Sequence, residues 1–107
     1  MNKYHRIRKY SELAQGWFDS TLECRRAEEL ILSEMADEIE DLRFQIKFRL
    51  CDKPKIDITL DFSYLEGGKR KFEDTKGIMT RDFRTKLAWL KEKYNVDVKI
   101  TKKDEVS

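Results

Sequence analysis

Two strand-like segments flank a Gly-Gly pair, and this arrangement constrains the fold more than any other feature of the sequence. The segments cover residues 56–65 and 70–76, with Gly67-Gly68 between them. A Gly-Gly pair between two strands is typical of a two-residue turn, so the sequence predicts a β-hairpin. With the turn at these glycines, Asp61 lies directly opposite Asp74, and Lys76 lies on the same face.

Like charges that face each other across a sheet destabilise it unless a cation lies between them. A divalent metal ion is the natural candidate, and a nearby lysine supplies the ammonium group that hydrolysis of a phosphodiester needs. Glu73 precedes Asp74 and therefore points to the other face of its strand. We expect Glu73 to lie outside the metal site.

A helix is predicted to begin after Ser20, because Glu23 follows at the third position of a capping box. Apolar residues recur in this segment at helical spacing and predict one packed side that runs through about residue 36: Cys24, Ala27, Ile31 and Met35. Glu23 lies on the flank of this side. Its carboxylate could cap the helix or reach the site predicted on the hairpin.

The remaining elements follow from periodicity. Residues 42–50 alternate apolar and polar side chains and predict a strand. Thr80 can cap a second helix, in which apolar residues repeat on one face: Phe83, Leu87, Leu90 and Tyr94. Residues 96–100 predict a last short strand, whereas residues 6–18 are ambiguous and extended around Gly16–Phe18. The predicted order is α-β-β-β-α-β after an N-terminal arm.

A chain of 107 residues forms one domain, in which we expect residues 1–18 to be a basic arm and lead-in and residues 102–107 a flexible tail. No apolar run approaches the roughly 20 residues of a membrane span, and the N-terminus lacks the apolar core of a signal peptide. We therefore expect a cytoplasmic protein without membrane contact. Cys24 and Cys51 are too few for a disulfide framework or a cysteine zinc site.

Positive charge gathers at the N-terminus and in the C-terminal half, which indicates an anionic partner such as DNA. The candidate contacts are Lys3, His5, Arg6, Arg8, Lys9, Arg81, Arg84 and Lys86. Solvated helix faces are an equally good explanation of the same charges. His5 is the sole histidine, which excludes a histidine zinc site and a Ser-His-Asp triad. We interpret Trp17 and Trp89 as packing residues.

The pattern Asp61…Asp74-Thr75-Lys76 resembles the signature of the PD-(D/E)XK nuclease superfamily. Leu60 stands where the superfamily's name has proline, a position that often varies. Five segments in the same order are similar to small phage-encoded nucleases of this superfamily: residues 3–5, 18–23, 61–64, 73–77 and the basic helix that ends at Lys93-Tyr94.

This resemblance implies a restriction-endonuclease-like αβββαβ core and a metal-dependent endodeoxyribonuclease. Its metal would be Mg²⁺, with Mn²⁺ as a substitute. The implied ligands are Asp61, Asp74, the Thr75 backbone carbonyl and Glu23, the last directly or through water. Lys76 would complete the catalytic set with the three carboxylates.

Some relatives in the superfamily resolve Holliday junctions, so the resemblance favours branched DNA, above all a four-way junction. Symmetric cutting of a junction needs two active sites and implies a homodimer. The resemblance also implies a phage or prophage protein in a bacterial host. The alternatives are a monomeric nickase or flap nuclease, and a non-catalytic DNA-binding module with a vestigial nuclease site.

Overall fold

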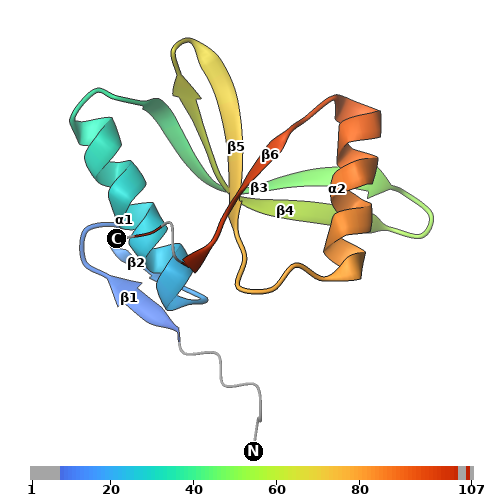
Figure 1. Cartoon of the computed structure of the whole chain (residues 1–107), viewed down its shortest axis with the longest axis horizontal. Coiled ribbons are helices and arrows are strands. Elements are labelled where there is room, and N and C mark those ends of the chain that lie inside the picture. Colours follow the sequence, from blue (N-terminus) through green and yellow to red (C-terminus); the bar gives the residue numbers. More distant parts are fainter. Residues whose placement is uncertain (1–7, 104–105, 107) are drawn as a thin grey trace, which may run out of the picture.

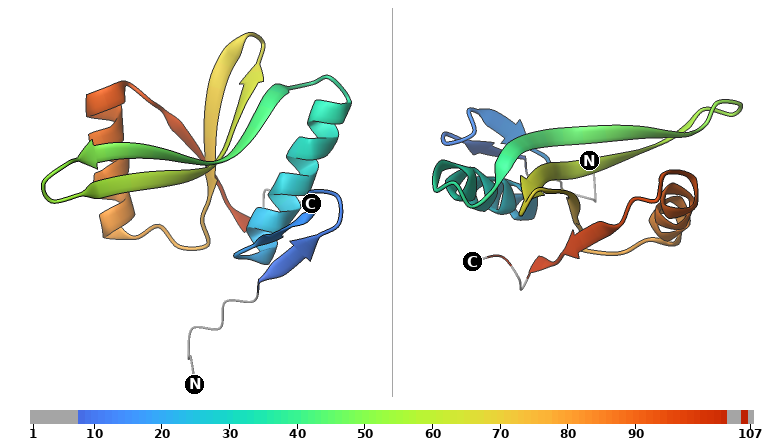
Figure 2. Two further views of the ribbon diagram at one scale, coloured as in Figure 1. Left: turned by 180° about the vertical axis from the view of Figure 1, so that it is seen from behind. Right: turned by 90° about the horizontal axis from the view of Figure 1, so that it is seen from above.

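The computed structural model describes residues 8–103 and residue 106. Its elements are β1 (Lys9–Ser11), β2 (Gly16–Phe18), α1 (Thr21–Met35), β3 (Glu40–Cys51), β4 (Ile56–Glu66), β5 (Lys69–Thr75), α2 (Arg81–Tyr94) and β6 (Val98–Thr101). Helices α1 and α2 lie at opposite sides of the molecule, and the strands cross between them (Figures 1 and 2). Among the described residues, neither helix has the length and apolar character needed to cross a membrane.

The main sheet has four strands in the order β3-β4-β5-β6. The first three strands are antiparallel, and β6 pairs in parallel with β5 after the α2 crossover. This mixed α/β fold confirms the predicted order of helices and strands. A separate hairpin of β1 and β2 precedes it. Gly16–Phe18 is extended, as predicted, but the pairing with Lys9–Ser11 was not predicted, because strands of three residues are too short to show a period.

The predicted turn of the β4–β5 hairpin is confirmed. Gly67 and Gly68 have φ of 60° and 78°, the left-handed values that a tight two-residue turn requires. The ladder runs from Glu66 opposite Lys69 to Phe62 opposite Glu73. This register brings the next residue of each strand, Asp61 and Asp74, together at the end of the ladder.

Helix α1 begins as predicted, because the Ser20 side chain accepts a hydrogen bond of 3.0 Å from the Glu23 backbone N–H. Ala27 and Leu30 are buried in a core cluster with Ile39, Phe62 and Tyr64. The prediction that Met35 packs inward was wrong, since it is 70% exposed. Ile39, from the turn after the helix, contributes to the core instead.

The second helix follows its predicted pattern more closely. Leu90 is buried against Leu50, Ile58 and Leu60, and Phe83 and Leu87 are half-buried beside them. Tyr94 is 42% exposed, but its hydroxyl donates a 2.6 Å hydrogen bond to the Arg49 carbonyl. The helix ends where Asn95 adopts a left-handed φ of 58°.

The predicted arm and tail lie partly outside the described residues. Lys3, His5 and Arg6 of the arm are among the residues that lie outside the described range. The described part of the lead-in is folded, because Lys9 is in β1 and the Ser11 hydroxyl donates a 2.7 Å hydrogen bond to Glu28 of α1. At the other end, Val106 lines a cavity together with Leu22 and Arg25 of α1.

Candidate active site

Asp61 and Asp74 meet where the β4–β5 ladder ends. The Asp61 backbone N–H donates a 2.8 Å hydrogen bond to Asp74 Oδ1. In return, Asp61 Oδ2 accepts hydrogen bonds from the Thr75 N–H at 2.9 Å and the Thr75 hydroxyl at 2.7 Å. The juxtaposition that the Gly-Gly turn predicted is therefore present.

Asp74 is buried with one oxygen left without a hydrogen-bond partner. The residue is only 1% exposed, and its Oδ2 accepts no hydrogen bond from any described residue. Lys76 Nζ lies 3.2 Å from Oδ2 and forms an ion pair with it. A buried carboxylate oxygen in this state is costly unless another ligand binds it.

The environment of Asp74 raises its pKa to about 6. Burial is the main cause, repulsion from Asp61 adds to it, and Lys76 acts in the opposite direction. Lys76 Nζ also lies 4.0 Å from the centre of the Phe83 ring, a cation–π contact with α2. Lys76 is thus held between the acid pair and the second helix.

Glu23 brings a third carboxylate to this place from the first turn of α1. It is 7% exposed, and its Oε2 accepts a 3.1 Å hydrogen bond from Gln45 Nε2. Burial raises its pKa to about 7, with further contributions from Asp61, Asp19 and Asp74. Its backbone N–H is capped by Ser20, but its carboxylate is turned toward Gln45.

A pocket of about 250 Å³, which we call the acid pocket, lies beside the acid pair. Glu23 and Asp61 line it together with Asp19, Ser20, Thr75 and Lys76. Three separate elements therefore deliver oxygen ligands and one ammonium group to a single place. Asp19 was not among the predicted site residues, although it directly precedes the helix cap.

Glu73 lies on the opposite face of β5, as predicted, and its surroundings are of another kind. It is fully buried and accepts hydrogen bonds from Tyr64 at 2.8 Å and Thr101 at 2.7 Å, in addition to two from Arg26. Burial alone would raise its pKa, but the hydrogen bonds from Arg26, Thr101 and Tyr64 hold the pKa below its ordinary value. Glu73 is a structural residue.

Magnesium prefers oxygen ligands and commonly uses one or two carboxylates. Within residues 8–103 and 106, no three Asp, Glu, His or Cys side chains already surround one point at which a metal could bind. Asp61 and Glu23 are turned toward Thr75 and Gln45 instead. The donor set nevertheless fits magnesium in chemical type, and Asp74 Oδ2, which has an ion pair with Lys76 but no hydrogen-bond partner, adds a further carboxylate oxygen to it.

The structure describes five of the eight predicted DNA contacts. Arg81 and Arg84 are exposed at the start of α2, where Lys86 is half-buried with its Nζ 3.7 Å from Asp82. Lys9 is exposed in β1, and Arg8 lies 3.9 Å from Asp19, a lining residue of the acid pocket.

Sequence reasoning missed Gln45 and misjudged Trp17. Gln45 has φ of 54° inside β3 and contacts Glu23, and no sequence signal marks such a backbone conformation at a glutamine. Trp17 is 59% exposed, so its interpretation as a packing residue was wrong, whereas Trp89 does pack against the α2 core.

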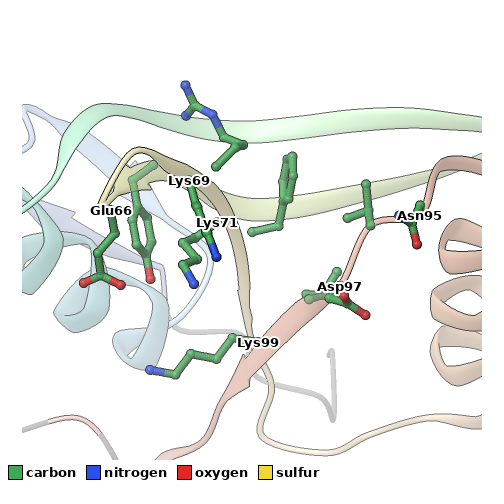
Figure 3. Close-up of a pocket in the computed structure, with 11 residues that line it drawn as sticks. Glu66, Lys69, Lys71, Asn95, Asp97 and Lys99 are labelled. Carbon is green, nitrogen blue, oxygen red and sulfur yellow. The ribbon is translucent and has the colours of Figure 1, made fainter.

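A larger cavity, of about 540 Å³, lies elsewhere, between the β4–β5 hairpin and β6. Figure 3 shows Lys69, Lys71 and Lys99 along it, with Glu66 and Asp97 far apart at its two sides. It contains no opposed pair of acids, so it is not the candidate active site.

The fold and the pocket define a small α/β protein with an acidic site flanked by one lysine. Residues 1–105 match the family described as a protein of unknown function, DUF1064, and the chain belongs to this family. No curated protein and no solved structure matches the chain. The geometry of the site is therefore the basis for a functional proposal.

Proposed function

We propose that this protein is a metal-dependent DNA endonuclease with a PD-(D/E)XK core that hydrolyses phosphodiester bonds. The observation that carries the proposal is the Asp61–Asp74 pair beside Lys76, with one buried oxygen of Asp74 lacking a hydrogen-bond partner. An acid pair that is unfavourable for the fold has no structural reason to persist. This argues against a vestigial site in a non-catalytic DNA-binding module.

The acid pair and three neighbouring residues have defined roles in this proposal. Asp61 and Asp74 would hold Mg²⁺ or Mn²⁺, the Thr75 carbonyl would supply a neutral ligand, and Glu23 would contribute directly or through water. When bound, the ion would supply Lewis-acid chemistry, lowering the pKa of a water molecule and polarising the phosphate. As an ammonium ion, Lys76 would orient that water and offset the negative charge of the transition state. To deprotonate the water, Lys76 would first have to give up its own proton.

The preferred substrate is branched DNA, above all a four-way junction. A domain this small has little surface with which to read sequence, so recognition of DNA shape is the simpler task. Arg81 and Arg84 are exposed immediately after the strand that carries Asp74, and phosphate contacts from them fit this geometry. Symmetric junction cutting needs a homodimer, which is part of the proposal, as are phage origin and a bacterial host.

A cleavage assay tests the proposal with duplex, single-stranded, flap and four-way DNA, each with and without Mg²⁺. We expect metal-dependent cutting of the junction and none by the Asp74→Asn variant. Preference for flaps, or cutting of one strand only, would favour the flap nuclease or nickase. Folded protein that binds DNA but cuts none, with Mg²⁺ or Mn²⁺ present, would overturn the enzymatic proposal.

A further inference from the structure

A second groove adjoins the acid pocket and has a different lining. It encloses about 310 Å³ and shares Asp19 and Glu23 with the acid pocket. Its other walls are mainly aromatic, from Trp17 and Phe18 on the lead-in side and Phe44 on β3, with Gln45 beside them. A molecule bound at the acid pocket can therefore extend into this groove without leaving the surface.

The aromatic rings of the groove are held in place yet remain open to solvent. Trp17 is 59% exposed and contacts the Tyr10 ring edge-on, with 5.2 Å between centroids. Phe44 is 39% exposed and is supported by Phe18 at 6.2 Å and Phe62 at 5.7 Å. Proteins that bind single-stranded nucleic acid use exposed aromatic rings of this kind as platforms on which bases stack.

Gln45 adds a hydrogen-bonding group at the point where the two pockets meet. Its Nε2 donates to Glu23, whereas its Oε1 has no hydrogen-bond partner among the described residues. The left-handed φ of 54° is strained for glutamine inside a strand, and strain of this kind is characteristic of functional sites. The side chain thus offers an acceptor to the edge of a ligand in the groove.

The acidic residues that line the groove determine which part of a nucleic acid can enter it. Asp19, and Glu23 in its ionised form, repel a phosphate from the groove, but not the neutral ring of a base. A base can stack there only if it is unpaired. We propose that the groove takes an unpaired nucleobase next to the scissile phosphate, stacked on Trp17 or Phe44 with its edge toward Gln45. This inference rests on the proposed nuclease function and narrows its substrate to DNA with an unpaired or opened position at the cut.

The test compares two DNA molecules that differ at one position: a branched DNA with an unpaired thymine at the branch point, and the same DNA with an abasic site there. Binding is measured by fluorescence anisotropy in EDTA, so that cleavage is not needed. We expect the wild-type protein to prefer the unpaired base by about tenfold, since stacking is worth about 1–3 kcal/mol per base. Trp17→Ala should remove that preference.

Two further variants complete the design. Leu13→Ala is the matched control, because Leu13 is 42% exposed, lies between β1 and β2 and does not line the groove. Gln45→Gly relieves the strained φ, so it should fold at least as well as wild type and still reduce the preference. It keeps the inference testable if Trp17→Ala misfolds.

The outcomes separate this inference from the proposed function. A base preference that depends on Trp17, without cleavage of any DNA, would sink the nuclease and keep the groove as a base-binding site. Cleavage with no difference between thymine and abasic DNA would overturn the inference alone. So would a Trp17→Ala variant that turns a dimer into a monomer while the base preference persists, because the groove would then be a protein interface.

Discussion

Glu73 and Asp74 are neighbours on β5, buried to the same degree, and yet they are opposite in kind. Glu73 accepts hydrogen bonds from Arg26, Tyr64 and Thr101, and its pKa is lowered. Asp74 faces a second aspartate, keeps one oxygen without a hydrogen-bond partner, and has its pKa raised to about 6. A buried carboxylate whose hydrogen bonds are all made stabilises the fold. A buried carboxylate that faces a like charge and lacks a hydrogen bond is instead suited to binding a cation.

The largest expected effect is on cleavage by Asp74→Asn. The amide keeps the shape of the side chain but removes a carboxylate that we propose as a metal ligand, so the cleavage rate should fall roughly 1000-fold or more. The melting temperature without metal should stay level or rise, because repulsion from Asp61 is relieved. Asp61→Asn should behave in the same way. Glu92→Gln, on the exposed surface of α2, is the matched control. Cleavage at the wild-type rate by Asp74→Asn would contradict the contrast between Asp74 and Glu73.

Glu73→Gln should lower the stability of the protein and leave its cleavage activity unchanged, the opposite of Asp74→Asn. Removing one partner of a buried ion pair typically costs about 3–5 kcal/mol of unfolding free energy, which urea denaturation measures. Cleavage per folded molecule should be unchanged, and Mg²⁺ should not restore the lost stability. If the variant were stable but inactive, Glu73 would belong to the active site and the contrast with Asp74 would be wrong.

Lys76→Ala separates chemistry from metal binding within the site. We expect the single-turnover cleavage rate to fall about 100-fold to 1000-fold, because the group that offsets transition-state charge is lost. Manganese affinity, measured by isothermal titration, should stay level or improve slightly once the neighbouring positive charge is gone. Loss of metal binding in a folded variant would instead assign Lys76 a structural role as the counter-charge of Asp74.

The pH dependence of stability should differ between the two carboxylate environments. Folding raises the pKa of Glu23 to about 7 and of Asp74 to about 6, so their protonated forms stabilise the metal-free protein. That stability is lost as the pH rises through 6 and 7. Glu73 acts in the other direction, since its lowered pKa gives stability that is lost only in acid.

The metal-free protein should therefore melt at a higher temperature at pH 5.5 than at pH 8. The difference should be several degrees, given about 4–8 °C per kcal/mol for a small domain. Added Mg²⁺ should raise the melting temperature more at pH 8, where the carboxylates are ionised. Asp74→Asn should shrink both effects, and a melting temperature independent of pH and metal would contradict them.

The difference between the two acids could be predicted only in part from the sequence. The Gly67-Gly68 turn fixes the register of the hairpin, and the alternation of a strand then places Asp74 with Asp61 and Glu73 on the other face. Local rules were sufficient for this. The four hydrogen bonds of Glu73 were not predictable, because they come from α1, β4 and β6, whose approach depends on tertiary packing.

The same limit explains the other misses. Helical spacing placed Glu23 on the flank of its helix, but only the docking of α1 brings its carboxylate to Asp61. The strained φ of Gln45 has no signature in a regular alternating strand. The apolar spacing of α1 includes Met35, but the sheet does not cover the helix at this residue. Spacing alone does not show where the surface that packs against a helix ends.

The smallest expected effect concerns the basic residues at the N-terminus, which should add binding without chemistry. The test removes residues 1–6 only, because Lys9 is part of β1 and Arg8 lies near Asp19. Losing Lys3 and Arg6 removes two potential phosphate contacts, so the salt slope of duplex binding should fall by about 2, at about 0.9 per contact. Cleavage at saturating enzyme should hardly change, in contrast to Asp74→Asn.

Replacing Lys53 and Lys55 by Ala removes the same charge from the β3–β4 loop and should leave the slope unaltered. An unchanged slope in the truncated protein, or a change in its oligomeric mass, would show that the arm does not contact phosphate.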